Sequence, residues 1–328
     1  MKKVAINGLG RIGRATMKII LDDPNLSLVG INDLVPPDNL AYLLKYDTVY
    51  GRYGKTVTAG EDHIAVDGVD YKVYSEKNPG LLPWAELDVD IVFECTGIFR
   101  TTEELERHVQ AGAKRVVLSA PAKDDIPMVV HGVNTYDGQQ PIVCCASCTT
   151  NCIAPVMEVI GRRIGVRKAV MTTIHAYTST QGLVDSPSKK LRRGRAAACN
   201  LVPTTTGAAR ATTKVLPQYE GRFDGVAARV PIPCGSISDI VIMTEKPTTV
   251  DEVNRVLTEE AGSERYQDIL GVTEEPLVSS DITGDGRASV VDLSMTQVID
   301  GDLLKIMTWY DNEWGYAAQM IKAAKAFQ

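Results

Sequence analysis

The first half of the chain alternates short apolar runs with stretches of helical periodicity. Lys3–Asn7 and Leu26–Asn32 are predicted strands, and the segment from about Arg11 to Leu21 between them is a predicted helix. Such alternation is typical of a parallel sheet covered by helices. The same pattern predicts the strands Asp90–Cys95, Arg115–Ser119 and Pro141–Cys145 and the helix Glu103–Ala111.

One hairpin interrupts this order. Lys55–Val66 and Val69–Tyr74 have strand character and are joined by Asp67-Gly68, a dipeptide that favours tight turns. We therefore expect an antiparallel pair inside the otherwise parallel region.

The second half has a different pattern of longer, β-branched runs with polar alternation, which predicts a mixed or antiparallel sheet beside a smaller set of helices. The predicted helix Ile153–Gly165 opens it, and a long loop from about Thr178 to Leu201 lacks periodicity. The last segment, Asn312 to Phe327, is amphipathic, and we expect it to return to the first domain. The predicted strands are Lys168–Tyr177, Ala227–Pro231, Ser238–Thr244, Ser289–Thr296 and Leu303–Trp309.

Composition narrows the class of protein. A chain of 328 residues with 44% hydrophobic and 23% charged residues is long enough for two globular domains. The net charge of −6 argues against a dedicated nucleic-acid site, although basic residues gather from Lys189 to Arg195. Met1–Ile6 enters a strand at once and no apolar run is long enough to span a membrane, so we expect a cytoplasmic protein without a membrane partner. The seven cysteines are an odd number and cluster around one site, which favours reduced thiols.

A glycine pattern follows the first predicted strand. Gly8, Gly10 and Gly13 form G-x-G-x-x-G before a helix, where they permit a tight turn, close approach of a pyrophosphate and close helix–strand packing. Asp33 ends the second strand, where its carboxylate can accept hydrogen bonds from a ribose diol and repel a 2′-phosphate. The two features together predict a dinucleotide site that prefers NAD to NADP.

The segment Cys144–Cys152 carries the candidate chemistry. Cys148 lies where a helix begins, next to serine and threonine caps, and a thiol in that position is expected to have a lowered pKa and to serve as a nucleophile. Cys152, one turn further, is interpreted as packing. His175, in the strand-like run Val170–Tyr177, is the leading candidate for the base, although a lone histidine in a strand is more often structural.

Other interpretations of these residues stay open. Cys145 and Cys148 also spell C-x-x-C, which suits a dithiol redox pair, whereas no second pair completes a zinc site. Thr204–Ala208 before an apparent helix, together with Arg193 and Arg229, suits an anion, but each of these could be a cap or a salt bridge. Asp281–Gly286 has some features of a calcium loop and is interpreted as a turn, so we expect no metal.

Several motifs together closely resemble those of the phosphorylating glyceraldehyde-3-phosphate dehydrogenases. The similarity covers essentially the whole chain and runs through Ile6–Arg14, Ser147–Cys152, His175–Thr178, Pro203–Ala209 and Trp309–Glu313. The cysteine motif is highly specific, unlike the glycine pattern.

The resemblance implies a Rossmann-type NAD-binding domain with a mostly parallel sheet and an α+β catalytic domain with a large mixed sheet. The first would comprise residues 1–147 plus the C-terminal helix 312–328, and the second residues 148–311. It also implies a homotetramer with the basic loop at the subunit core.

The same resemblance implies the roles of individual residues. Cys148 would be the nucleophile and His175 its base, with glyceraldehyde 3-phosphate, inorganic phosphate and NAD as reactants. Residues implied to lie around NAD are Gly8, Gly10, Arg11, Ile12, Gly13, Asp33, Lys77, Thr96, Ser119, Asn312 and Tyr316. Residues implied to bind phosphate groups are Thr178 and Arg229 in one pocket and Ser147, Thr149, Thr206 and Gly207 in the other, with Arg193 nearby.

Two departures from the family pattern concern the site. Cys144-Cys145 stands where the family commonly has Ser-Asn, from which we expect greater sensitivity to oxidation, and Ser186-Pro187 differs from some NAD-specific members at its first residue. An erythrose-4-phosphate dehydrogenase, a Cys145/Cys148 redox sensor and an NAD-responsive interaction module are the alternatives.

Overall fold

The chain folds into two compact units. The computed structural model describes residues 1–136 and 138–327. The first unit contains Met1–Val129, Tyr136–Ala146 and the residues from Met320 onward, and the second contains Val130–Thr135 and Ser147–Gln319. This division differs from the expected domains in assigning Val130–Thr135, Ser147 and residues 312–319 to the second unit, and Gln328 lies outside the described residues. The expected domain boundaries therefore stay a prediction.

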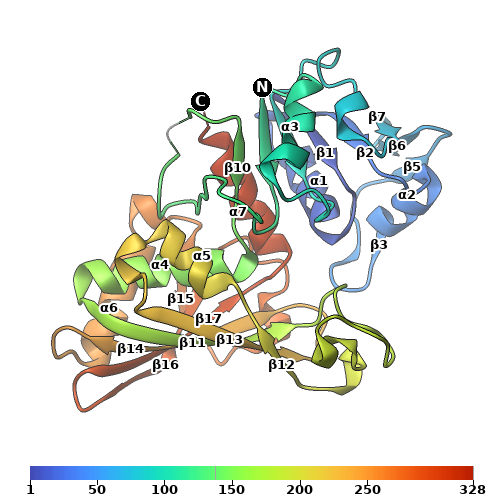
Figure 1. The fold of residues 1–328 in the computed structure, drawn as a ribbon. Coiled ribbons are helices and arrows are strands. Elements are labelled where there is room, and N and C mark those ends of the chain that lie inside the picture. Colours follow the sequence, from blue (N-terminus) through green and yellow to red (C-terminus); the bar gives the residue numbers. More distant parts are fainter. Residues whose placement is uncertain (137, 328) are drawn as a thin grey trace. The chain divides into compact units, whose positions relative to one another are not determined.

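An eight-stranded sheet forms the first unit, in the order β10-β9-β8-β1-β2-β7-β6-β5 (Figure 1). Neighbouring strands from β10 to β7 run parallel, and β7, β6 and β5 pair antiparallel. The bounds are β1 Lys2–Asn7, β2 Leu26–Asn32, β5 Val57–Ala59, β6 His63–Val66, β7 Val69–Tyr74, β8 Ile91–Glu94, β9 Arg115–Leu118 and β10 Ile142–Cys144. The predicted parallel sheet is confirmed.

Strand β1 lies between β2 and β8, where the strand order reverses. In such sheets ligands bind outside the carboxyl ends of the strands at this switch point. The three strands end in register, with Asn7 opposite both Asn32 and Glu94. The glycine pattern and Asp33 follow directly from two of these ends.

Three helices belong to the first unit. The predicted helices are confirmed as α1 Arg11–Asp22 and α3 Thr102–Gln110, the latter with a capping box between Thr101 and Glu104. A helix absent from the sequence prediction, α2 Pro37–Lys45, starts with a proline in its first turn, where the missing N–H costs nothing.

The hairpin was predicted correctly at its turn and wrongly at its length. Asp67 and Gly68 have φ of 49° and 81°, as a mirror-image tight turn requires. The first predicted strand is divided into β5 and β6, because the chain turns at Gly60 before it pairs again. A further short pair, β3 Tyr46–Asp47 and β4 Gly51–Arg52, was not predicted.

The second unit has a seven-stranded sheet in the order β12-β13-β11-β14-β17-β16-β15. Two neighbouring pairs, β11 with β13 and β15 with β16, are parallel and the others are antiparallel, so the predicted mixed sheet is confirmed. The bounds are β11 Val166–Ala176, β12 Val202–Thr205, β13 Phe223–Val230, β14 Ser236–Thr244, β15 Leu270–Thr273, β16 Ser289–Ile299 and β17 Leu303–Tyr310.

Helices α4 Cys148–Arg163, α5 Ala208–Val215 and α6 Val250–Ala261 lie on one face of this sheet (Figure 1). Helix α4 begins five residues before the predicted helix and contains Pro155, and nearly all its middle turns are buried. The segment of residues 178–201 has only the short 3-10 turns Leu191–Gly194 and Ala197–Cys199. The last helix, α7, runs from Trp314 to Lys325.

Candidate active site

Cys148 is the first residue of α4. Ser147 before it has extended backbone angles, and its hydroxyl accepts a hydrogen bond from the amide of Thr150 at 3.1 Å, which caps the helix. Ala146 has φ of +57°, a left-handed conformation that is strained for a residue with a side chain. A strained turn and a side-chain cap thus fix where the helix begins and hold the thiol at its positive end.

His175 meets this thiol from strand β11. Its Nε2 lies 3.4 Å from Sγ of Cys148, and its Nδ1 lies 2.7 Å from the carbonyl oxygen of Ala176. The ring is buried, with 4% of its surface exposed. A proton on Nδ1 would be donated to Ala176 and would leave Nε2 free to accept the proton of the thiol.

Arg229, on the neighbouring strand β13, packs against the same imidazole. β11 and β13 place His175 and Arg229 opposite one another, and a guanidinium nitrogen of Arg229 donates to the carbonyl of Ala176 at 2.8 Å. Burial and the adjacent positive charge of Arg229 lower the pKa of His175 to about 3. The imidazole is therefore neutral at physiological pH.

The predicted fall in the thiol pKa is wrong for this arrangement. Burial raises the pKa of Cys148, although Arg229, the hydroxyl of Thr149 and the helix amides act in the opposite direction. The sequence shows a helix start but not the surroundings of Cys148, which is partly buried in the folded unit. The raised pKa of the thiol and the lowered pKa of the imidazole both favour the uncharged forms of the pair.

Tyr310 contacts both His175 and Thr149, the residue after Cys148. Its hydroxyl lies 2.8 Å from the hydroxyls of Thr149 and Thr173, and its ring packs edge-on to His175 with centroids 5.9 Å apart. Tyr310 lies in a motif that the sequence analysis quoted, but no role was assigned to it. Its contacts depend on the order of β11, β14 and β17, which the local pattern does not give.

Ser236 was also missed. Its hydroxyl accepts from the backbone amide of Ala176 at 3.1 Å and donates to the side-chain oxygen of Asn312 at 2.9 Å. It therefore connects the residue after His175 to a candidate cofactor residue. Asp311, next to Asn312, accepts from the amides of Glu313 and Trp314 at 2.8 Å and so caps the start of α7.

The candidate anion-binding residues of the second unit lie on two groups of elements. Arg193 donates from Nε to the hydroxyl of Thr204 at 2.9 Å, which fixes the loop against β12 beside Thr206 and Gly207. The hydroxyl of Thr206 accepts from the amide of Ala208 at the start of α5, at 3.1 Å. At Gly207 a Cβ would meet nothing within 4 Å. Open space before a helix N-terminus suits an oxyanion.

The second group combines Thr178 with Arg229. The hydroxyl of Thr178 lies 2.8 Å from that of Thr180, and its amide donates to the side chain of Gln181. Nε of Arg229 is buried and has no hydrogen-bond partner among residues 1–136 and 138–327. A buried guanidinium donor without an acceptor indicates a place for an anionic ligand.

The dinucleotide pattern of the first unit has the geometry that its glycines predict. Gly8 has φ of +93°, and a Cβ at Gly13 would lie 2.0 Å from the carbonyl oxygen of Gly8. A Cβ at Gly10, in contrast, would meet nothing within 4 Å, so the space over this turn is open. The three glycines thus serve the turn, the open approach and the packing respectively. The residues present fit a dinucleotide.

The other candidate cofactor residues of the first unit differ in their contacts with this turn. Asp33 accepts from the amides of Leu9 and Val35 at 2.7 and 3.0 Å, which fixes its carboxylate beside the turn. Thr96 packs on Gly8, whereas Arg11 pairs with Asp47 at 2.6 Å. The amide of Ser119 donates to the carbonyl of Glu94, and Ile12 lies in the first turn of α1. Lys77 is exposed. Tyr316, which belongs to the second unit, is buried in α7.

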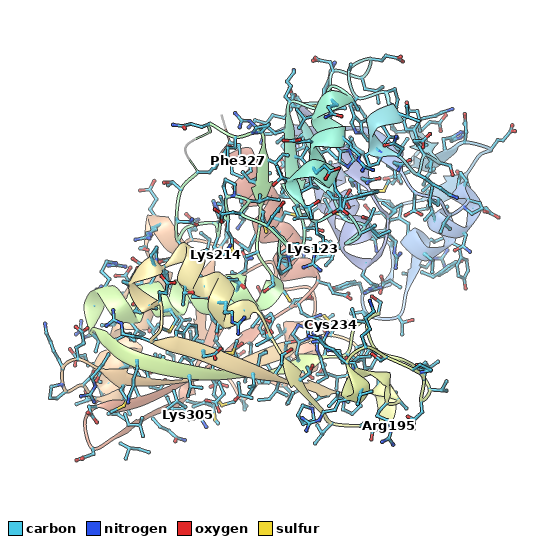
Figure 2. All side chains as sticks on the ribbon, in the orientation of Figure 1. Lys123, Arg195, Lys214, Cys234, Lys305 and Phe327 are labelled. Atoms are coloured by element: carbon cyan, nitrogen blue, oxygen red, sulfur yellow. The ribbon has the colours of Figure 1, made fainter. Side chains whose placement is uncertain are left out.

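The cysteines next to Cys148 in the sequence, Cys144, Cys145 and Cys152, are poorly placed for redox chemistry. All seven cysteines are free, and Cys144, Cys145 and Cys152 are fully buried. Burial raises the pKa of Cys145 well above its usual range and that of Cys152 to about 12. Both effects disfavour the thiolate that disulfide exchange requires, which weakens the dithiol interpretation and the expected sensitivity to oxidation. Cys234, labelled in Figure 2, donates to Asp311 at 3.2 Å.

The described residues, 1–136 and 138–327, show neither a metal-binding cluster nor a membrane-spanning helix. They contain no group of three or more His, Cys, Asp or Glu side chains that could hold a metal ion. Asp281 lies in a 3-10 turn, Ser279–Ile282, and Gly284 donates its amide to Asp311. No helix within them is long and apolar enough to cross a membrane.

Comparison with known proteins gives matches along the chain. Residues 2–102 match the family model for the NAD binding domain of glyceraldehyde 3-phosphate dehydrogenase, and residues 147–312 match that for its C-terminal domain. Glyceraldehyde-3-phosphate dehydrogenase 2 of Streptomyces avermitilis is 48% identical over 323 residues, covering 97% of this chain and 96% of the relative. The enzymes of Clostridium pasteurianum and Geobacillus stearothermophilus are 44% and 45% identical, covering 100% and 98% of this chain and 98% and 97% of their own lengths.

Proposed function

The chain belongs to the glyceraldehyde-3-phosphate dehydrogenase family, and from that membership and the geometry of Cys148 and His175 we propose how it works as an NAD-dependent oxidoreductase. The proposed reaction is the oxidative phosphorylation of glyceraldehyde 3-phosphate to 1,3-bisphosphoglycerate, in the direction of glycolysis or in reverse.

The first step is nucleophilic attack. Sγ of Cys148 adds to the aldehyde carbon while Nε2 of His175 takes the thiol proton across the 3.4 Å contact. The proton then passes to the carbonyl oxygen, which gives a thiohemiacetal. Amides at the start of α4 are available to stabilise the negative charge on that oxygen.

The second step is oxidation of the thiohemiacetal. The chemistry that NAD supplies when bound is acceptance of a hydride, and Gly8, Gly10, Gly13 and Asp33 are the residues placed to hold it. As the carbon loses hydride, His175 takes the hydroxyl proton and Cys148 remains acylated as a thioester. The low pKa of His175 keeps Nε2 unprotonated and ready for this transfer.

The third step releases the product. An oxygen of inorganic phosphate attacks the thioester carbon, the C–S bond breaks, and the sulfur regains a proton from His175. We assign the phosphate of the aldehyde to Thr178 and Arg229, and the attacking phosphate to Ser147, Thr149, Thr206 and Gly207 with Arg193 beside them. The cation of Arg229 without an acceptor on Nε supports the first assignment.

The single observation that carries the proposal is the contact between Sγ of Cys148 and Nε2 of His175 at the start of a helix. The experiment mixes the protein with NAD and glyceraldehyde 3-phosphate and follows the absorbance of reduced nicotinamide. With phosphate present we expect steady turnover. Without phosphate we expect at most one equivalent of NADH per site, because the thioester is then not released. Continued rapid turnover without phosphate, or none with it, would reject the proposal.

Erythrose 4-phosphate is the comparison substrate in the same assay. The chemistry of attack and oxidation is unchanged with a longer aldehyde, so only the specificity constants separate the two reactions. We expect kcat/KM to be higher for the triose phosphate, and a higher value for erythrose 4-phosphate would reassign the substrate.

We further propose that the protein works as a homotetramer in the cytoplasm. The sheet face opposite the helices of the second unit, which carries Lys305 in Figure 2, exposes Val170 and Val226 by 54% and 55%. Beside it, Leu191 of the basic loop is 85% exposed, and a groove of about 630 Å³ lies between loop and sheet. An apolar surface of this kind suits a second copy of the chain. Light scattering of the purified protein tests the assembly, and a monomer at micromolar concentration would contradict it.

A further inference from the structure

A buried carboxylate lies beneath the dinucleotide turn and takes no part in the mechanism above. Glu94 is the last residue of β8, and its side chain is fully buried. Its neighbours across the sheet at the switch point are Asn7 on β1 and, beyond it, Asn32 on β2. Three polar side chains thus occupy the last positions of three adjacent parallel strands.

Each oxygen of Glu94 accepts hydrogen bonds. Oε1 accepts from the amide of Thr96 at 2.7 Å and from its hydroxyl, and Oε2 accepts from Nδ2 of Asn7 at 2.5 Å and from Nε2 of His108 at 3.2 Å. A buried carboxylate is tolerated when donors surround it in this way. The geometry therefore indicates that both oxygens of Glu94 act as acceptors.

His108 of α3 is a neutral donor in this cluster. Nε1 of Trp84 lies 3.0 Å from Nδ1 of His108, and an indole N–H can only donate. Nδ1 therefore accepts, and the ring proton is on Nε2, where it points at Glu94. The side chain of His108 is fully buried, so the assignment does not depend on solvent.

One branch from Glu94 reaches the phosphate-binding turn. Its two contacts with Thr96 fix that residue against Gly8, where a Cβ would lie 2.8 Å from both the side chain and the amide of Thr96. Thr96 therefore packs directly against the glycine turn. A shift of Thr96 moves the glycine turn that receives the pyrophosphate.

The other branch reaches the loop that carries Lys77. Oδ1 of Asn7 accepts from Nδ2 of Asn32 at 2.7 Å. Asn32 in turn accepts from the amide of Glu76 and donates to its carbonyl, both at 2.9 Å. These two bonds hold the backbone next to Lys77 at the end of β2.

We propose that Glu94 is a positioning residue of the dinucleotide site, which fixes Thr96 against Gly8 and, through Asn7 and Asn32, fixes the turn of Glu76 and Lys77. The inference rests on the NAD site of the proposed function. According to this inference, NAD binding depends not only on the residues implied to lie around NAD but also on a buried carboxylate, Glu94, that only accepts hydrogen bonds.

The central test is Glu94→Gln, which keeps the shape and replaces one acceptor oxygen with a donor. The new NH₂ group has to face donors on either side, so Thr96 or Asn7 loses its partner. We expect the dissociation constant for NAD, measured by fluorescence titration, to rise about tenfold or more. ADP-ribose, which lacks the nicotinamide, should weaken by the same factor, while kcat at saturating NAD stays within about twofold.

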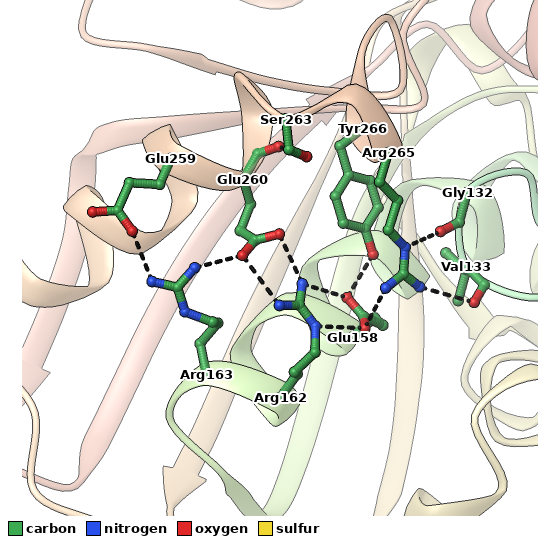
Figure 3. A network of polar contacts seen from close by, with 10 residues as sticks. All are labelled: Gly132, Val133, Glu158, Arg162, Arg163, Glu259, Glu260, Ser263, Arg265 and Tyr266. Carbon is green, nitrogen blue, oxygen red and sulfur yellow. Dashed lines mark hydrogen bonds and ion pairs between the residues drawn. The ribbon is translucent and has the colours of Figure 1, made fainter.

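The chain offers a matched control in a second buried carboxylate. Figure 3 shows Glu260 of α6, which accepts from Arg162 at 2.7 Å and from Arg163 at 2.5 Å within a network that also joins Glu158 to Arg265. All these residues belong to the second unit, whereas the glycine turn belongs to the first. Glu260→Gln should lower the melting temperature and leave the dissociation constant for NAD unchanged.

Further outcomes decide the proposal. A folded Glu94→Gln protein that binds NAD like the wild type would overturn it, as would an equal loss of affinity in Glu260→Gln. If Glu94→Gln does not fold, Asn32→Asp tests the second branch, because it removes both donors of the amide and keeps the shape. Folded Asn32→Asp is expected to bind NAD more weakly, and unchanged binding would overturn the proposal. A wild-type protein that does not bind NAD would instead reject the proposed function, and this inference with it.

Discussion

The guanidinium of Arg229 lies 2.7 Å from Nδ1 of His175, so a permanent positive charge touches the imidazole that we propose takes the thiol proton. The two residues are also neighbours across β11 and β13. Arg229 therefore has two effects: it offers a cation to an anionic substrate, and it opposes protonation of the base.

These effects can be separated with Arg229→Leu and an aldehyde that has no phosphate. Loss of the charge should raise the pKa of His175 from about 3 toward its usual value, with burial still holding it below that value. Since a protonated imidazole cannot accept a proton, kcat/KM for glyceraldehyde should fall at a higher pH in the variant than in the wild type. The measurement is the pH profile of both proteins, with glyceraldehyde 3-phosphate as the comparison. An identical acid limb for the two proteins would contradict the assigned role.

The same histidine makes folding stability depend on pH. Its pKa is lowered on folding, chiefly by burial, so the unfolded chain binds the proton more readily than the folded one. Its contribution is present above the unfolded pKa of about 6.5 and is lost as the pH falls from there toward the folded value. Urea unfolding at pH 7 and pH 4 should therefore show a smaller loss of stability in His175→Gln than in the wild type. Equal losses would mean that folding does not lower the pKa of His175.

Cys148→Ser tests the nucleophile. A serine hydroxyl is a far weaker nucleophile at neutral pH, so we expect turnover to fall by a factor of about a thousand or more. NAD binding should be unchanged, because the dinucleotide turn lies in another part of the fold. Cys199→Ser is the control, since Cys199 is exposed and lies in the loop, and it should keep full activity. Activity retained in Cys148→Ser would remove this thiol from the mechanism.

The second and third glycines of the glycine pattern, Gly10 and Gly13, should respond differently to replacement by alanine. Gly10→Ala meets no atom within 4 Å, so the protein should fold normally and bind NAD more weakly, because the methyl group occupies the open approach. Gly13→Ala places a Cβ 2.0 Å from the carbonyl oxygen of Gly8, so it should destabilise the fold itself. Melting temperature and NAD titration together distinguish the two results. A stable Gly13→Ala protein with normal affinity would show that the turn can shift.

The features that depend on residues close together in the chain could be predicted from the sequence. The glycine turn, the helix start at Cys148 and the strand that carries His175 were placed from short motifs, and the structure brings Sγ and Nε2 within 3.4 Å. Ser236 and Tyr310 could not be found in this way, because their contacts arise from strands far apart in the chain. The thiol pKa was predicted in the wrong direction for a related reason, since burial is a property of the assembled unit.

The partners of the buried Glu94 could not be predicted from the sequence either. Its run Ile91–Glu94 was predicted as a strand, but a carboxylate at a strand end has no local signal of partners on other strands. Only the order β8-β1-β2 brings Asn7 and Asn32 beside it. Register between parallel strands is thus the information that a single sequence leaves out.

The first strand is joined to the last turn of the chain. Nζ of Lys2 donates to the carbonyl of Lys325 at 3.2 Å and to that of Phe327, and Lys325 pairs with Asp23 at 2.6 Å. During synthesis the N-terminal residues leave the ribosome long before these partners do. The first unit therefore lacks these contacts until residue 327 has been synthesised. A nascent chain that stalls before residue 327 is expected to need a chaperone, even though the residues of its glycine turn have already been synthesised.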